Sequence, residues 1–195
     1  MKSKHFLFAM LLVCWSLYGN AQDGHKRFGF ELSPGVSFAT GNVAGAALKP
    51  GFGFEGNVHF AVSSRFGIYG GWGWNRFASD KALGLSDVCF EETGYIFGLQ
   101  YSMPISESRL SFYARAGMLA NHIEIENSNG DIVADSGHGL GFQVAGGLTY
   151  PLGSNWILSP GIKFNSLNRD VRRAGMDQDA NLRYLSLRIG VIRIF

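Results

Sequence analysis

The chain has 195 residues, of which 16% are charged, 14% are aromatic and 27 are glycine, and its formal net charge is +2. Soluble domains average about 25% charged residues and about 7% glycine, so this composition departs from theirs. A mean hydropathy of +0.05 excludes a bundle of membrane-spanning helices, each of which needs about 20 consecutive apolar residues. The small, scattered net charge predicts no nucleic-acid partner.

The N-terminal segment has the three-part layout of a secretory signal peptide. Two lysines precede an apolar run from Phe6 to Tyr18, and small residues then occupy Gly19 and Ala21. The run is too short for a permanent helical anchor, because each helical residue rises only about 1.5 Å. We expect residues 1–21 to be cleaved, which leaves residues 22–195 as a single exported domain.

Beyond the signal segment, apolar residues alternate with small or polar residues, which is the periodicity of a β-strand. Phe28 and Phe30 share one face of the first segment, for example, while Gly29 and Glu31 share the other. Each segment is long enough for a tilted strand to cross a bilayer, which takes about 9–11 residues. The eight segments lie at about residues 28–38, 52–62, 66–77, 89–103, 110–118, 139–150, 156–165 and 183–195.

The connections between these segments alternate in length. Short turns are expected at residues 63–65, 104–109 and 152–155, and longer polar loops at residues 40–47, 78–88, 127–137 and 169–180. Outer-membrane barrels place short turns in the periplasm and long loops outside. The pattern therefore predicts an all-β fold, a closed eight-stranded antiparallel up-and-down transmembrane β-barrel.

Side-chain volume indicates which face of the barrel meets lipid. The interior of an eight-stranded barrel is only just wide enough for side chains to fill it. The apolar face carries many bulky rings, such as Phe30, Trp72 and Phe142, whereas the other face carries mainly glycine, alanine and serine. We therefore expect the apolar face to point outward into lipid, where closure is required because hydrocarbon cannot satisfy unpaired backbone groups.

The same alternation places a set of charged residues inside the barrel. They are Glu31, Glu55, Arg115, Lys163 and Arg188. Two acids and three bases in one lumen predict a structural network of ion pairs. A proton or ion path through the lumen is the alternative.

The glycine–aromatic alternation, the Asn20-Ala21-Gln22 junction and the final strand from Arg183 to Phe195 resemble a known group. This group is the small outer-membrane β-barrel proteins of Gram-negative bacteria, of the OmpX, OmpA-barrel and OmpW type. The chain is particularly similar to the outer-membrane β-barrel domain family common in Bacteroidota, over essentially the whole mature sequence.

The resemblance implies an integral outer-membrane location, with membrane lipid and lipopolysaccharide around the barrel. It also implies that the barrel-assembly machinery recognises Gly190 and the terminal Phe195 as an assembly signal. Arg193 departs from the family pattern, which has an apolar residue at that position. The family is functionally mixed, so the resemblance implies no particular activity.

Several polar residues are expected at the outer rim, near the end of the fifth strand. They are His122, Glu124, Glu126, Asp131, Asp135, Ser136 and His138. A serine, a histidine and a carboxylate within reach would form a hydrolytic triad, but the His-x-Ser pair of the outer-membrane deacylases is absent. The aspartate spacing matches no EF-hand calcium loop. We therefore expect no catalytic residue, no metal and no cofactor.

The last loop carries the basic cluster Arg169, Arg172 and Arg173, which would contact lipopolysaccharide phosphates or form part of a solvated mixed-charge loop. The leading functional hypothesis is a non-enzymatic outer-membrane barrel with a structural or surface-interaction role through its extracellular loops. The alternatives are a narrow channel or carrier for small or apolar molecules, and a lipid-modifying enzyme.

Overall fold

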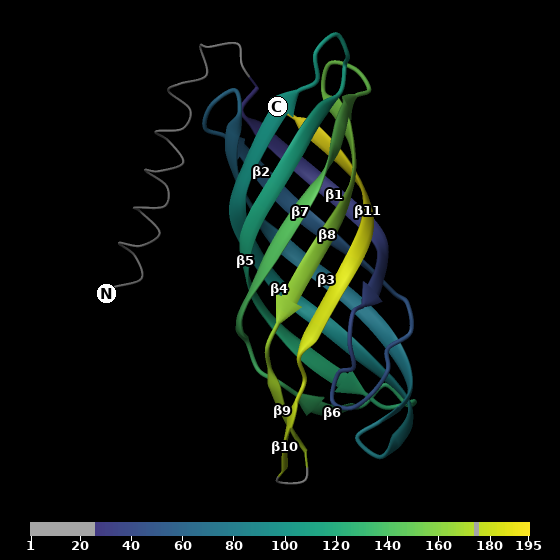
Figure 1. Ribbon diagram of the computed structural model, residues 1–195. Helices are drawn as coiled ribbons and strands as arrows, with labels where there is room; N and C mark the ends of the chain where they lie inside the picture. Colours follow the sequence, from purple (N-terminus) through teal and green to yellow (C-terminus); the bar gives the residue numbers. More distant parts are fainter. Residues whose placement is uncertain (1–25, 174–175) are drawn as a thin grey trace, which may run out of the picture.

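Eight long antiparallel strands form one closed barrel in the computed structural model, which describes residues 26–173 and 176–195 (Figure 1). Neighbours in the sequence pair with each other, and the first strand pairs with the last, which closes the sheet. The predicted eight-stranded up-and-down barrel is confirmed. Its strands are β1 (Phe28–Ala39), β2 (Gly51–Ala61), β3 (Phe66–Ala82), β4 (Leu85–Pro104), β5 (Ser111–Glu126), β7 (Gly139–Pro151), β8 (Trp156–Leu167) and β11 (Leu182–Ile194).

The predicted signal peptide, residues 1–21, lies outside the described residues. Within the part of the chain that the structure describes, no helix is long and apolar enough to span a membrane.

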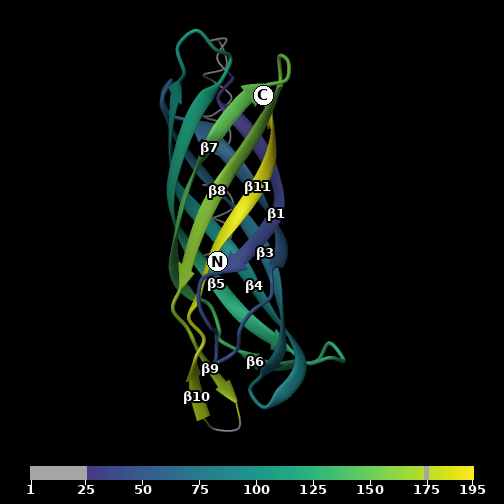
Figure 2. The same cartoon turned by 45° about the vertical axis from the view of Figure 1, so that its right-hand side comes forward.

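Three further short strands lie at the end of the barrel opposite the C-terminus (Figures 1 and 2). Strand β6 (Ile132–Asp135) pairs with the end of β5, and β9 (Asp170–Arg173) pairs with β10 (Met176–Asp179) as a separate hairpin. The sequence analysis assigned all three to long loops. They show that the outer end of the barrel carries ordered β-structure.

The prediction of a long loop at residues 78–88 is also wrong, because β3 and β4 extend through most of this segment. Only Leu83 and Gly84 connect them, with φ angles of 53° and 74°. Two consecutive residues with positive φ are typical of the tight turn that matches the twist of a hairpin. Inward and outward side chains continue to alternate through this segment, but the outward ones are polar. A polar outer face resembles a loop in the sequence, which explains the wrong prediction.

The outer face along most of the barrel is apolar, as the volume argument predicted. Phe30, Phe52, Phe97 and Leu187 all point outward and are between 50% and 62% exposed. Exposed large hydrophobic side chains occur on each of the eight long strands, so they form an apolar belt that surrounds the barrel. Such a surface is stable only against lipid or another protein.

The polarity of the wall reverses at the outer end, where the strands extend past the apolar belt. Here Phe77, Phe90 and Ile123 are fully buried inside, while Arg76 and Glu91 form an ion pair on the outside. We call the buried group the apolar cap; it comprises Phe77, Phe90, Ile123, Ile125 and Leu182, with Val43 and Ala46 from the loop after β1. An apolar interior and a charged exterior are typical of protein in water.

Trp74 lies at the level where the wall changes from apolar to charged. Its indole N–H donates to Glu91 Oε2 at 3.0 Å, while its ring contacts Phe54 at a centroid distance of 5.9 Å. Tryptophan is enriched at membrane interfaces because its ring is apolar and its N–H is polar. Strands β3, β4 and β5 have 17, 20 and 16 residues, which leaves an extension beyond the length needed to cross a bilayer.

Glycine in the lumen makes room for two buried tyrosines. The Tyr69 ring lies over Gly98 and Gly117, and the hydroxyl of Tyr113 occupies the space that a Cβ at Gly161 would need. The glycine-rich inner face is thus a close-packed surface for aromatic rings, and the lumen is filled rather than open.

Candidate functional site in the lumen and at the outer rim

A first group of lumen residues surrounds Glu31, which is 1% exposed. Its Oε2 atom lies 2.8 Å from Arg115 Nη2 and 2.7 Å from His59 Nε2. The Nε–H of Arg115 donates to Gln100 Oε1 at 2.7 Å, and its guanidinium lies over the Tyr113 ring at 4.6 Å from the centroid. These contacts hold a buried acid and a buried base together in the half of the barrel nearer the short turns.

A second group surrounds Glu55, which is likewise buried. Lys163 Nζ donates to Glu55 Oε1, and the Gln143 amide donates to the same oxygen at 3.3 Å. The Tyr69 hydroxyl donates to Gln143 Oε1 at 3.0 Å. Lys163 and Glu55 therefore form a buried ion pair with hydrogen-bonded neighbours, the arrangement that a buried charge requires.

A third group surrounds Glu92, which the sequence analysis did not single out. Its Oε2 accepts hydrogen bonds from Asn75 Nδ2 at 2.8 Å and from the Tyr184 hydroxyl at 2.9 Å, and its Oε1 accepts one from Asn121 Nδ2. Arg188 donates to Asn75 Oδ1, which connects its charge to this group. The signal was available, because Glu92 has the same two-residue phase as the inward Gly94 and Gly98.

With Glu92 included, three acids accompany the three bases Arg115, Lys163 and Arg188 among the buried residues that the structure describes in the lumen. The five residues predicted from the sequence all lie there, each no more than 9% exposed. We call the six residues Glu31, Glu55, Glu92, Arg115, Lys163 and Arg188 the polar network. Its formal charges cancel, whereas the five residues alone leave an excess positive charge.

A cavity of about 190 Å³ lies at the end of the barrel that carries the short turns. His59 and Gln100 line its side toward the polar residues around Glu31, and apolar side chains such as Phe60, Ile157 and Ile192 line much of the rest. This mouth is therefore of mixed polarity.

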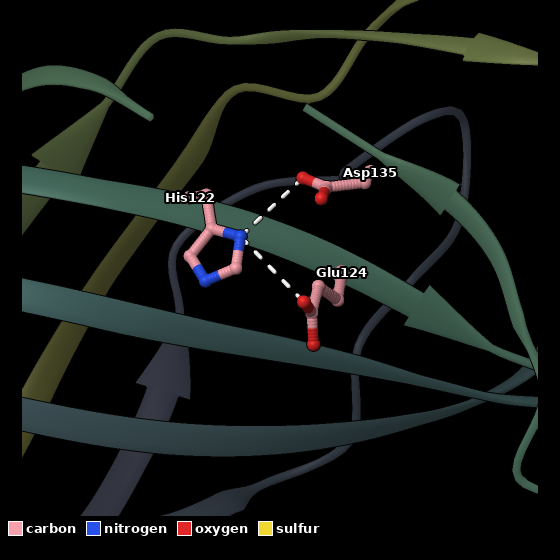
Figure 3. Close-up of side chains that lie close together, drawn as sticks. All are labelled: His122, Glu124 and Asp135. Atoms are coloured by element: carbon pink, nitrogen blue, oxygen red, sulfur yellow. Dashed lines mark hydrogen bonds and ion pairs between the residues drawn. The ribbon is translucent and has the colours of Figure 1, made fainter. Parts of the chain in front are cut away.

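The outer rim brings together His122, Glu124 and Asp135 on the outside of the barrel extension (Figure 3). His122 and Glu124 come from β5 and Asp135 from β6. His122 Nδ1 lies 3.4 Å from Asp135 Oδ1 and 3.7 Å from Glu124 Oε1. The His138 ring stacks on the His122 ring, with centroids 4.4 Å apart and planes 13° from parallel.

The remaining rim candidates have other partners. Ser136 donates its hydroxyl proton to the Gly137 carbonyl at 3.0 Å and accepts from the Ile123 N–H at 2.8 Å. Asp131 accepts from Asn127 Nδ2 at 3.1 Å, and Glu126 lies 3.2 Å from Arg76. These contacts bind Ser136 to the backbone and arrange no serine–histidine–carboxylate relay among the described rim residues.

The sequence matches the profile of the family described as outer membrane protein beta-barrel domain over residues 6–195. The chain belongs to this outer-membrane β-barrel family. Its location in the outer membrane, expected from the sequence, is therefore established, together with its transmembrane fold. No curated protein matches it by sequence.

Solved outer-membrane proteins share the fold of this family member. The crystal structure of Neisserial surface protein A (NspA) has a TM-score of 0.65 at 17% identity, covering 86% of this chain and 97% of that one. OprG from Pseudomonas aeruginosa has a TM-score of 0.54 at 12% identity, with coverages of 86% and 97%. Ail, the attachment invasion locus protein of Yersinia pestis, solved with the heparin analogue sucrose octasulfate, has a TM-score of 0.50 at 13% identity, with coverages of 87% and 99%.

The basic cluster of this outer-membrane barrel is only partly described. Arg169 donates to the Leu140 carbonyl at 2.9 Å and to the Asn121 carbonyl at 3.3 Å, which ties the start of the last loop to β5 and β7. Burial lowers the pKa of Arg169, and the charge of Glu92 opposes that effect. Arg172 and Arg173 belong to β9, but their side chains lie outside the described part of the structure.

Of the two residues that the family resemblance marks as an assembly signal, Gly190 lies on the closing strand β11 and Phe195 directly follows that strand. A Cβ at Gly190 would collide with Glu31 Oε1, so this position faces the polar network and has no room for a side chain. Phe195 is 60% exposed, and its N–H donates to the Phe28 carbonyl at 2.8 Å. The Arg193 guanidinium lies 5.5 Å from the Trp156 ring centroid and 5.3 Å from that of Phe195, so two aromatic rings flank its charge.

Proposed function

We propose that this outer-membrane barrel is a non-enzymatic scaffold whose extracellular end has a structural or surface-interaction role. The observation that carries the proposal is the filled lumen. The polar network occupies the membrane-spanning part, and the apolar cap occupies the outer end, where Phe77, Phe90 and Ile123 are fully buried. The ordered outer extension is then the part that is available to partners.

This arrangement disfavours the alternative of a narrow channel. A solute crossing the barrel would have to separate the buried Lys163–Glu55 and Arg115–Glu31 pairs and then displace the apolar cap. Breaking a buried ion pair leaves an uncompensated charge, which costs several kcal/mol. The polar network therefore stabilises the closed barrel in this proposal.

The proposal of a non-enzymatic role rests on the outer rim. A serine nucleophile needs a base within hydrogen-bond reach. The Ser136 hydroxyl donates to a backbone carbonyl instead, and His122 faces two carboxylates. A lipid-modifying enzyme would change lipid A or phospholipid chains on overexpression, and we expect unchanged lipid mass spectra.

Export and assembly complete the proposal. Residues 1–21 would direct secretion and be removed, and the barrel-assembly machinery would recognise the closing strand through Gly190 and Phe195. Outer-membrane lipid and lipopolysaccharide would surround the apolar belt. No cofactor is needed for this role.

A loop-trimmed barrel tests the surface role directly. The N–H of Ala180 donates to the Arg169 carbonyl at 2.7 Å, so a two-residue Asn-Gly turn in place of residues 170–179 can close the last loop at this pair. The replacement also removes the buried Val171 and the Asp179 carbonyl that accepts from the Ala44 N–H. We expect the trimmed protein to insert at wild-type levels, with heat-modifiable gel migration. In a deletion strain it should fail to restore surface attachment and detergent resistance that the full-length protein restores.

Planar-bilayer recording distinguishes the scaffold role from the alternative of a narrow channel. We expect stable insertion of the full-length protein without conductance steps. Full restoration by the trimmed barrel would contradict a role for the outer hairpin, and reproducible conductance in the same preparation would favour the channel.

A further inference from the structure

We propose that His122, Glu124 and Asp135 bind a zinc ion on the outer surface of the barrel extension, with a fourth coordination position open to solvent. This inference goes beyond the scaffold role and is independent of it. No metal was expected from the sequence, because the aspartate spacing matches no EF-hand calcium loop. The pairing of β5 with β6 places them on one face (Figure 3).

The strand geometry brings the three side chains together. His122 and Glu124 are two residues apart on β5, so both point to the same face of the sheet. Asp135 is the direct partner of Glu124 in the antiparallel register of β5 and β6. Side chains of directly opposed residues start about 4.5–5.5 Å apart at Cβ, which leaves space for an ion between their ends.

The separations of the donor atoms suit tetrahedral zinc. Zn–N and Zn–O bonds of about 2.0–2.2 Å place ligand atoms about 3.3–3.6 Å apart at the corners of a tetrahedron. His122 Nδ1 lies 3.4 Å from Asp135 Oδ1 and 3.7 Å from Glu124 Oε1, and all three donor atoms lie within 4.8 Å of one another. The first distance lies within this range and the second is slightly above it, and both are longer than an ordinary hydrogen bond.

The charged residues on this surface leave Glu124 and Asp135 without enough positive charge beside them to balance their carboxylates. Arg76, Glu91, Glu124 and Asp135 are successive partners across β3, β4, β5 and β6. Arg76 forms ion pairs with Glu91 and with Glu126. Like charges on directly opposed residues are destabilising, and in the described structure His122 is the basic group that faces Glu124 and Asp135.

Neighbouring groups hold the ligands in place. The N–H of Gly137 donates to Asp135 Oδ1 at 2.8 Å, and the stacked His138 ring fixes the plane of His122. Hydrogen bonds to ligand carboxylates and contacts that orient a ligand histidine are typical outer-shell features of metal sites. An imidazole with two carboxylates is a donor set that zinc accepts. Bound zinc would hold β6 against β5 at the outer rim.

Isothermal titration of the refolded, untagged barrel with zinc chloride, after removal of metal with a chelator, tests this site. We expect binding of one zinc ion per barrel. His122→Ala and Asp135→Asn should each weaken binding by more than about 100-fold, because loss of an outer-shell partner alone costs about 10–100-fold. Cobalt(II) should give the visible absorption of a tetrahedral site in the full-length protein and lose it in both variants.

The matched control is Glu107→Gln, which removes one exposed acid from a short turn at the other end of the barrel. It should leave zinc binding unchanged. All three ligands lie on the outside of the extension, so we expect their variants to fold. Heat-modifiable gel migration checks the folding of each variant. If one of them does not fold, Glu124→Gln takes its place. Absence of zinc binding, or equal affinity in the control and the ligand variants, would overturn the proposal.

Discussion

Replacing Lys163 by methionine is expected to lower the free energy of unfolding by about 3–5 kcal/mol. Lys163 and Glu55 are 4% and 5% exposed, and they form an ion pair inside the lumen. Methionine fills a similar volume but carries no charge, so the Glu55 carboxylate remains buried without its cation. Urea titration of the barrel refolded into lipid vesicles, followed by tryptophan fluorescence, measures the loss.

A second substitution separates the lost charge from lost packing. Removing the acid as well, in Glu55→Gln with Lys163→Met, should recover most of the stability, because paired removal of a buried ion pair is often neutral. Lys49→Met is the matched control: Lys49 pairs with Asp80 at an exposed position, where an ion pair contributes little. The account is wrong for this pair if the double variant is as unstable as Lys163→Met, or if Lys49→Met is equally damaging.

Replacing Leu187 by arginine is expected to cost about 2–4 kcal/mol, the penalty for arginine on the lipid face near the bilayer midplane. Leu187 is 51% exposed and lies between Val36 on β1 and Ile162 on β8, in the middle of the apolar belt. On a water-facing surface the same change would be nearly neutral. The same vesicle-based urea titration measures it.

Ala78→Arg is the control for the position of the substituted residue relative to the bilayer. Ala78 is also an exposed residue on the outer face, but it lies on the extension of β3, between Arg76 and Asp80. If the membrane boundary lies at Trp74, this change should alter stability by no more than about 0.5 kcal/mol. Equal penalties at the two positions would place the boundary elsewhere, and two neutral substitutions would contradict a lipid-facing belt.

The sequence predicted the membrane-spanning part of the barrel well, because one physical constraint governs it. Within lipid, every strand must be apolar outward and small or polar inward, so a two-residue alternation indicates both strand and face. The alternation alone predicts that Arg115 and Glu31 lie on the inner face. It predicts the same for Glu92, which lies two residues before the inward Gly94.

The outer extension was predicted poorly for a related reason. Past Trp74 the barrel leaves the lipid, and its polarity reverses, so that Phe77 points inward and Arg76 outward. Apolar and polar residues still alternate there, but the apolar ones point inward and the polar ones outward. A prediction that expects apolar residues on the outer face therefore assigns such strands to loops. The grouping of His122 with Asp135 depends on the register between β5 and β6, which short-range patterns do not determine.

The central claim is that bulky apolar side chains face hydrocarbon while small and charged ones fill the lumen. Quenching of a single tryptophan by lipids with brominated acyl chains tests it most directly. In a background where Trp72, Trp74 and Trp156 are phenylalanine, a tryptophan introduced by Leu187→Trp should be strongly quenched, and one introduced by Tyr113→Trp should be protected. Protection at the first position with quenching at the second would contradict the account.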